Sequence, residues 1–432
     1  MVANVSPVAV NVAGLTRQPV VDRDQKLFAY KVMARSGSAE LFRRIDPTSE
    51  PSVASGSAGR SSVGAAPLDV ASDTMLSLQH LSANRSFIVG IDRDQLLNRT
   101  YLSMPSSSTV LETPAPDQMD AEFIQACVGV REAGYRLVLD DIIVDRRAQP
   151  LLEHIDMLNV EFPALADDQH RRIVEAATRF GFSAIADAVD TQDDFQRAIE
   201  LGYSHCHGRY YCKPRRRAPG KLQASQVIYL QLLHEVNSPQ FSLDDVEALI
   251  RQDVALTVRL LQYLNSPAFG LRTNVTSIRH ALAVLGHRPL RQWLTLISVS
   301  ELSRGKPEVL LITSLVRAKF CEAICKSVAN DQVAAEAFLT GMLSLLDAIL
   351  DQPMNEILSS LSLTESIRRS LLDRESSTGV LIDLIQSLEE ADWRWMAALS
   401  FQMGLDEQLI FNSYESAILW TTTILGHLSS AN

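Results

Sequence analysis

The sequence predicts two domains: an α/β half built on a parallel sheet, followed by an all-helical half. The chain has 432 residues, about three times a typical domain of roughly 150 residues. From about residue 68 to residue 213, short β-rich runs alternate with helical patterns, which predicts a parallel sheet, either open or closed into a barrel. Past Pro214 the apolar residues follow a period of about 3.6, and no convincing strand pattern occurs.

Composition and charge exclude several classes of protein. Hydrophobic residues make up 46% and charged residues 21% of the chain, as expected for a folded globular protein. No apolar run reaches the ~18 residues of a membrane helix, and the start of the chain lacks the positive charge of a signal peptide, so a cytoplasmic protein is expected. Five cysteines without a CxxC pair favour neither a disulfide framework nor a zinc site. The net charge of −11 disfavours nucleic acid and anionic membrane surfaces as partners.

The N-terminal half begins with an interruption and continues with regular alternation. Residues 36–67 are dominated by Ser, Gly, Ala and Pro, which cannot form a core, so this segment is predicted to be a flexible insertion. The predicted strands are Phe87–Ile91, Thr109–Leu111, Arg136–Leu139, Leu158–Phe162 and Ser183–Ala186. The predicted helices between them include Asp117–Ala133, Asp167–Phe180 and Gln192–Leu201.

Acidic residues follow three of these strands. They are Glu112, the pair Asp140 and Asp141, and Asp187. In a β/α barrel the C-terminal ends of the strands meet on one face, where carboxylates could gather around a divalent cation. Asp is also a common strand-ending and helix-capping residue, and on the pattern alone this second interpretation is favoured.

The C-terminal half reads as a series of helices. Apolar residues from Asp244 to Leu264 predict one helix, with Asp244 and Asp245 in its first turn. Ser277 can cap the next helix and Gly286 can end it. Similar apolar stripes run through 310–327, 333–350, 378–390, 394–403 and 406–426.

The N-terminal half resembles the EAL domain, the barrel of cyclic di-GMP phosphodiesterases. The segments that carry the resemblance are 17–22 (RQPVVD), 28–35 (FAYKVMAR), 110–112 (VLE), 134–141 (GYRLVLDD), 184–191 (AIADAVDT), 201–203 (LGY) and 208–214 (GRYYCKP). Their order and spacing agree with the family over about 200 residues. The resemblance implies a TIM-like β/α barrel.

The C-terminal half resembles the HDOD domain, an all-helical relative of HD-type hydrolases that lacks their metal site. Leu260–Gly270 and Ile278–Gly286 carry this resemblance, and Ser344 and Leu345 stand where active relatives have the His-Asp dyad. Together the two halves indicate a bacterial EAL–HDOD signalling protein. The predicted organisation is a disordered tail at 1–14, an EAL domain at 15–214, a linker at 215–221 and an HDOD domain at 222–432.

The sequence departs from the EAL pattern at most site positions. The metal-binding Glu that names the family is replaced by Lys31, the Asn ligand by Gly90, the catalytic Lys by Asn159, its partner Asp by Glu161, the two Glu of a later motif by Asp187 and Asp190, and the late Gln by His207. The retained positions are Glu112, Asp140 and Asp141.

These replacements oppose metal-dependent hydrolysis. Lys31 puts a cation where a carboxylate would attract the metal, and unit charges in contact interact by several kcal/mol even at an effective dielectric of about 20. Gly90 supplies no ligand, and Asn159 cannot act as a general base. Lys31 is predicted to pair with Glu112 or Asp140 instead. We therefore expect no enzymatic activity, no bound metal and no cofactor.

The leading functional hypothesis is a non-enzymatic signalling protein that acts through contacts with other proteins, with motility, biofilm formation or virulence as outputs implied by the resemblance. A cyclic di-GMP receptor without turnover and a residual phosphodiesterase are the alternatives. Gln18 and Arg35 stand at positions where the family contacts the nucleotide. We favour a structural hydrogen-bonding role for both, because most polar groups of the site are lost. The sequence identifies no partner and leaves homo-oligomers open.

The helical half offers a candidate docking edge. Residues 222–432 carry a net charge of −8, which favours a protein partner that presents a basic or amphipathic helix. Phe269, within the turn-like segment Asn265–Leu271, is the docking candidate. A packed connection between two helices is the alternative interpretation of this segment, and it is favoured.

Overall fold

The structure, a computed structural model, describes residues 14–35, 67–83, 85–115, 120–140, 148–215, 224–238, 242–253, 256–258, 260, 286–374 and 376–430. The predicted insertion lies outside the described residues except for Pro67, which begins a helix. The predicted tail and linker also lie outside them, except for Gly14 and Arg215. Asp141, Phe269 and Ser277 are among the residues not described, so the predictions made for them stay predictions.

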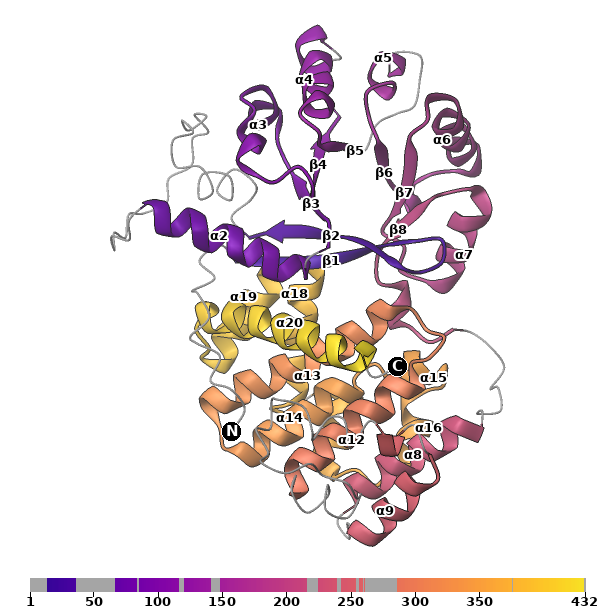
Figure 1. Ribbon diagram of the computed structural model, residues 1–432, viewed down its shortest axis with the longest axis vertical. Coiled ribbons are helices and arrows are strands. Elements are labelled where there is room, and N and C mark those ends of the chain that lie inside the picture. The colour runs from indigo at the N-terminus through magenta and orange to yellow at the C-terminus, as the bar shows by residue number, and fades with distance from the viewer. Residues whose placement is uncertain are drawn as a thin grey trace.

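The N-terminal domain is a closed barrel of eight strands that follow one another around the barrel in sequence order (Figure 1). The strands are β1 (Leu15–Asp22), β2 (Leu27–Ala34), β3 (Phe87–Gly90), β4 (Thr109–Pro114), β5 (Arg136–Asp140), β6 (Met157–Glu161), β7 (Ser183–Asp187) and β8 (His205–His207). Neighbours from β2 to β8 pair in parallel, whereas β1 is antiparallel to both β2 and β8. This confirms the predicted parallel sheet and shows that it is closed.

Helices cover the outside of the barrel between successive strands. They are α2 (Pro67–Ser82), α3 (Arg93–Leu97), α4 (Ala121–Glu132), α5 (Gln149–Leu152), α6 (Asp167–Phe180) and α7 (Gln192–Leu201), with short 3-10 turns at Thr100–Ser103, Phe162–Ala164 and Tyr210–Cys212. Side-chain oxygens of Asp92, Asp120 and Thr191 accept the first free N–H groups of α3, α4 and α7. One apolar layer fills the barrel centre: Val20, Ala29, Ile88, Val110, Val138, Met157 and Ile185. The barrel is therefore a packed core with a site at its rim.

The C-terminal domain is helical throughout its described part, as predicted (Figure 1). Its helices are α8 (Ala224–Asn237), α9 (Leu243–Arg251), α12 (His287–Leu302), α13 (Glu308–Val328), α14 (Asp331–Leu343), α15 (Leu346–Leu350), α16 (Met354–Ser359), α17 (Glu365–Leu372), α18 (Gly379–Glu390), α19 (Trp393–Met403) and α20 (Glu407–Ser430). Helix α13 packs against α14, α18 and α20. At Gly341 of α14 a side chain would meet the Arg317 carbonyl oxygen at 2.5 Å, so glycine allows the two helices to touch.

Two predicted helices are interrupted. The prediction of one helix from Asp244 to Leu264 is wrong, because α9 ends at Arg251 and the chain turns at Asp253. The Asp253 carboxylate accepts hydrogen bonds from the Leu256 backbone N–H at 3.1 Å and from the Tyr229 hydroxyl at 2.6 Å, which fixes the turn. The stripe at 333–350 is likewise divided, into α14 and α15.

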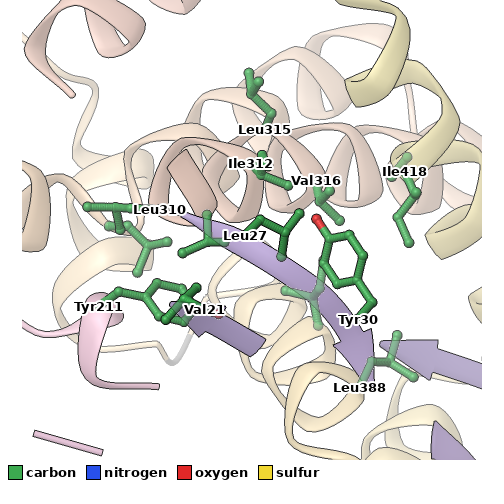
Figure 2. Close-up of a cluster of buried hydrophobic side chains, with 14 of the residues drawn as sticks. Val21, Leu27, Tyr30, Tyr211, Leu310, Ile312, Leu315, Val316, Leu388 and Ile418 are labelled. Atoms are coloured by element: carbon green, nitrogen blue, oxygen red, sulfur yellow. The ribbon is translucent and has the colours of Figure 1, made fainter. Parts of the chain in front are cut away.

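The two domains share one hydrophobic core. The β1–β2 hairpin forms the side of the barrel that faces the helical domain (Figure 1), and Val21, Leu27 and Tyr30 on it are buried. Figure 2 shows these side chains packed against apolar residues of the helical domain; the labelled members of the cluster are Val21, Leu27, Tyr30, Tyr211, Leu310, Ile312, Leu315, Val316, Leu388 and Ile418. Because the seam is apolar and continuous, it holds the two domains in a fixed relation.

By length and composition alone, one stretch of the described chain is suited to cross a membrane. It runs from Asp331 to Leu350, and 72% of its most apolar window is buried inside the protein. This burial places the stretch in the core of the helical domain, where α14 packs on α13.

Candidate functional site

A lysine lies among the carboxylates at the rim of the barrel. The Lys31 ammonium on β2 is 3.0 Å and 2.9 Å from the two Glu112 carboxylate oxygens on β4, and 3.8 Å from Asp187 Oδ2 on β7. Only 15% of the Lys31 side chain and 9% of the Glu112 side chain are exposed. The predicted ion pair is therefore confirmed for Glu112, whereas no Lys31–Asp140 ion pair occurs between these two described residues.

Hydrogen bonds extend this cluster across the neighbouring strands. The Asn159 amide on β6 donates to Asp140 Oδ1 and to Asp187 Oδ2, both at 2.9 Å. His207 Nδ1 on β8 lies 2.6 Å from Asp187 Oδ1, which also accepts the backbone N–H of Ala188. Strands β5, β6, β7 and β8 thus add side chains to those of β2 and β4. We define this rim cluster as Lys31, Glu112, Asp140, Asn159, Asp187 and His207.

The charges of the rim cluster are mutually stabilised. Burial alone would lower the pKa of Lys31, but the Glu112 and Asp187 carboxylates outweigh it and raise that pKa, which keeps the ammonium charged. Burial raises the pKa of Glu112, and Lys31 opposes this shift. Burial also acts to raise the pKa of Asp187, yet the hydrogen bond and charge of His207, with Lys31 and Asn159, hold it well below its usual range.

The rim cluster does not fit a divalent cation. The Lys31 ammonium occupies the space between the carboxylates, and no group of three or more His, Cys, Asp or Glu side chains suited to a metal is present in the described part of the chain. At Gly90 a Cβ would meet no atom within 4 Å, so this position leaves open space beside Glu112, its neighbour on β4.

Two of the predicted acidic site residues that the structure describes, Glu161 and Asp190, lie outside the rim cluster. Glu161 ends β6 with its side chain exposed to solvent, although its backbone is in register with Asp187. Asp190 is exposed and accepts the Arg209 backbone N–H at 3.0 Å.

Both candidate nucleotide-contacting residues reach the helical domain. Gln18 Nε2 donates to the Glu389 backbone oxygen at the end of α18, at 2.9 Å. Arg35 forms an ion pair with Glu407, the first residue of α20. The partners of both side chains lie in the helical domain, and the sequence does not indicate that these two residues join the domains.

A second charged cluster, which sequence reasoning missed, joins the domains next to the rim. Arg317 on α13 is 0% exposed, and its guanidinium donates to both carboxylate oxygens of Glu389, at 2.8 Å and 2.6 Å. Arg209, which follows β8, lies 3.4 Å from the same carboxylate and also pairs with Glu390. Glu389 thus receives guanidinium groups from both domains. No sequence motif marks these residues, because their partners are distant along the chain.

A cavity of about 230 Å³ lies between this cluster and the rim. Gln18, Asp187, His207 and Arg209 line it from the barrel side, and Glu389 with apolar residues of α13 lines it from the helical side. The end of α18 therefore forms a wall at the barrel rim.

Comparisons with known proteins agree with this architecture. Residues 222–371 match the HDOD domain family. The chain is 26% identical to the cyclic di-GMP phosphodiesterase CdgJ of Vibrio cholerae over 412 residues, which cover 95% of this chain and 92% of CdgJ. It is 25% identical to YuxH of Bacillus subtilis over 420 residues, covering 95% of this chain and 98% of YuxH. Among solved structures it is similar to the FimX EAL domain of Xanthomonas citri in complex with cyclic di-GMP, with 14% identity, 46% and 85% coverage, and a TM-score of 0.33.

The organisation of the chain follows from the fold and these comparisons. Residues 222–371 match the HDOD domain family, and the N-terminal half is a closed barrel of eight strands. The similarity to CdgJ and YuxH extends over both domains, so their combination in one chain is shared with these relatives.

Proposed function

We propose that this protein acts in cyclic di-GMP signalling as a non-catalytic regulator that works through contacts with other proteins. The relative CdgJ, which is similar along nearly the whole chain, connects it to this signalling network. The observation that carries the proposal is the Lys31 ammonium, 2.9 Å from Glu112 and 3.8 Å from Asp187. An internal cation in this place repels a second cation, and hydrolysis of a phosphodiester by such a barrel needs metal ions to generate hydroxide and to stabilise phosphoryl charge.

The rest of the rim cluster supports the same proposal. Asn159 is committed to Asp140 and Asp187 through both of its amide hydrogen bonds, and an amide cannot accept a proton as a general base. His207 is committed to Asp187. Each polar group therefore stabilises its neighbour and is not poised toward a substrate.

The contacts between the domains favour regulation by other proteins that bind the surface of this protein. Gln18 and Arg35 are bonded to Glu389 and Glu407, so both would have to break a contact with the helical domain in order to bind a ligand. The shared apolar core resists such a separation. A partner that binds either domain would thus meet a rigid two-domain body.

A receptor that binds without turnover is the second candidate. The 230 Å³ cavity favours it, because Gln18, His207 and Arg209 line this cavity at the rim. Arg209 is the cation best placed there to meet a phosphate.

Isothermal titration of the full chain with cyclic di-GMP separates the two candidates. We expect no saturable heat up to about 100 μM ligand, which corresponds to binding weaker than roughly −5 kcal/mol. Binding that is tighter than this, that Arg209→Ala abolishes and that the matched exposed variant Arg172→Ala on α6 leaves intact, would replace the regulator by the receptor.

A further inference from the structure

A larger cavity lies at the junction of the domains, next to the rim cavity. Its volume is about 550 Å³. The chain that follows β8 contributes Arg209 and Lys213. Ser344, directly after α14, and Asp347 on α15 line the cavity from the helical domain, together with Arg374 and Gln386. Both domains therefore build this cavity, which we call the junction cavity.

Three side chains of the junction cavity have hydrogen-bond donors to spare. Arg374 forms an ion pair with Asp383 Oδ1 at 3.8 Å, but its buried Nη1 has no hydrogen-bond acceptor. Lys213 and Gln386 make no side-chain hydrogen bond or ion pair with the residues that the structure describes. A buried N–H group without an acceptor is costly, and an anion would supply the missing acceptor.

The carboxylates that line the same cavity are already engaged. Glu390 pairs with Arg209, and Asp190 accepts the Arg209 backbone N–H. The Asp347 carboxylate accepts the Ala348 N–H at 2.9 Å, and burial raises its pKa, which disfavours its negative charge. Lys213 is thus the less neutralised cation, and Arg374 has a single distant partner, Asp383, with one N–H group left without an acceptor.

We propose that the junction cavity binds a small phosphorylated molecule, whose phosphate accepts hydrogen bonds from Lys213, Arg374 and Gln386. The volume lies within the range of about 300–1,000 Å³ that small-molecule sites occupy, and such sites favour domain interfaces. The planar guanidinium of Arg374 suits two phosphate oxygens. This site goes beyond the proposed function, because it shares neither Lys31 nor Glu112 with the rim cluster.

Binding at this junction has a consequence for the whole chain. Because both domains supply side chains to the phosphate, the ligand stabilises only the docked arrangement, and its binding free energy adds to the stability of the folded chain. The concentration of the phosphorylated ligand would then set the stability of the contact between the two domains.

Titration of the full chain with 5′-GMP, inorganic phosphate and guanosine tests the proposal. We expect GMP and phosphate to bind and to raise the melting temperature, and guanosine, which lacks the phosphate, to do neither. Lys213→Ala and Arg374→Gln are each expected to weaken GMP binding at least about tenfold, as lost charge-assisted hydrogen bonds do. Arg394→Gln, a change of an exposed arginine on α19, is the matched control and should leave binding unchanged.

Two results would overturn the proposal. One is the absence of binding by the unchanged chain for both GMP and phosphate up to about 10 mM, which is weaker than roughly −3 kcal/mol. The other is binding that neither Lys213→Ala nor Arg374→Gln weakens. If Arg374→Gln fails to fold, the exposed Lys213→Ala, with Gln386→Ala beside it, still decides the question.

Discussion

Replacing Lys31 by methionine is expected to lower the free energy of unfolding by about 3–5 kcal/mol at pH 7, because it leaves a buried carboxylate without its cation. Glu112 is only 7% exposed, and the Lys31 ammonium contacts both of its oxygens. Methionine has a similar length, so the loss measures the charge more than the packing. Guanidinium unfolding of both proteins provides the measurement.

The effect of this variant depends on pH in a defined direction. The pKa of Lys31 is raised in the folded state, so its stabilising contribution is fully present below the unfolded pKa of about 10.4 and is lost as pH rises through the folded pKa. The difference between the two proteins should therefore shrink above about pH 10.4, and also in acid, where Glu112, whose pKa is raised by burial, is protonated and no longer leaves a charge without a partner. Lys26→Met, on the exposed turn of the same hairpin, is the control and should have no measurable effect. A Lys31→Met chain as stable as the parent would show that the ion pair contributes nothing.

The Arg317→Met variant, which lacks the guanidinium, is expected to have a free energy of unfolding that is lower by a similar amount, about 3–5 kcal/mol. Arg317 is 0% exposed and makes the two hydrogen bonds to Glu389, while a third reaches the Ser344 hydroxyl at 3.2 Å. Without it, the cation that remains beside the Glu389 carboxylate among the described residues is the more distant Arg209, at 3.4 Å. The melting curve of the full chain should shift to a lower temperature.

A second substitution separates the charge from the shape of Arg317. The double variant Arg317→Met with Glu389→Gln removes the stranded charge and should recover part of the lost stability. Arg369→Met is the control, because this arginine on α17 is 68% exposed and pairs with Glu365, which is 65% exposed. Equal effects of Arg369→Met and Arg317→Met would contradict a buried link between the domains.

The sequence pattern predicts the strands and helices whose limits are set by residues nearby in the chain. Each strand from Phe87 to Asp187 was predicted because apolar runs are bounded by turns, and α6 and α7 because their apolar stripes are strong. The pattern alone did not predict β1 and β2. Polar Gln18 and Lys31 interrupt their alternation, and the apolar residues of the hairpin pack on another domain.

The sequence predicts the residue types of the candidate site, but not the residues of the helical domain that surround it. Lys31, at a position where the resemblance implies a metal-binding carboxylate, predicts an ion pair with Glu112 or Asp140, and the structure shows the pair with Glu112. The contact between Gln18 and Glu389 spans 371 positions, and no local signal indicates it. Asp253 shows the same limit on a smaller scale, because an unbroken apolar stripe conceals the turn that its carboxylate fixes.

Hydrolysis of cyclic di-GMP is the most direct test of the proposal that Lys31 takes the place of a metal ion at the barrel rim. The purified full chain, incubated with Mg²⁺ or Mn²⁺, should form no linear dinucleotide above a protein-free blank, because Lys31 excludes the metal ions that this chemistry needs. Clear turnover that is abolished by Glu112→Gln or Asp140→Asn would show that the rim cluster is a working active site, and the non-catalytic function would then be wrong.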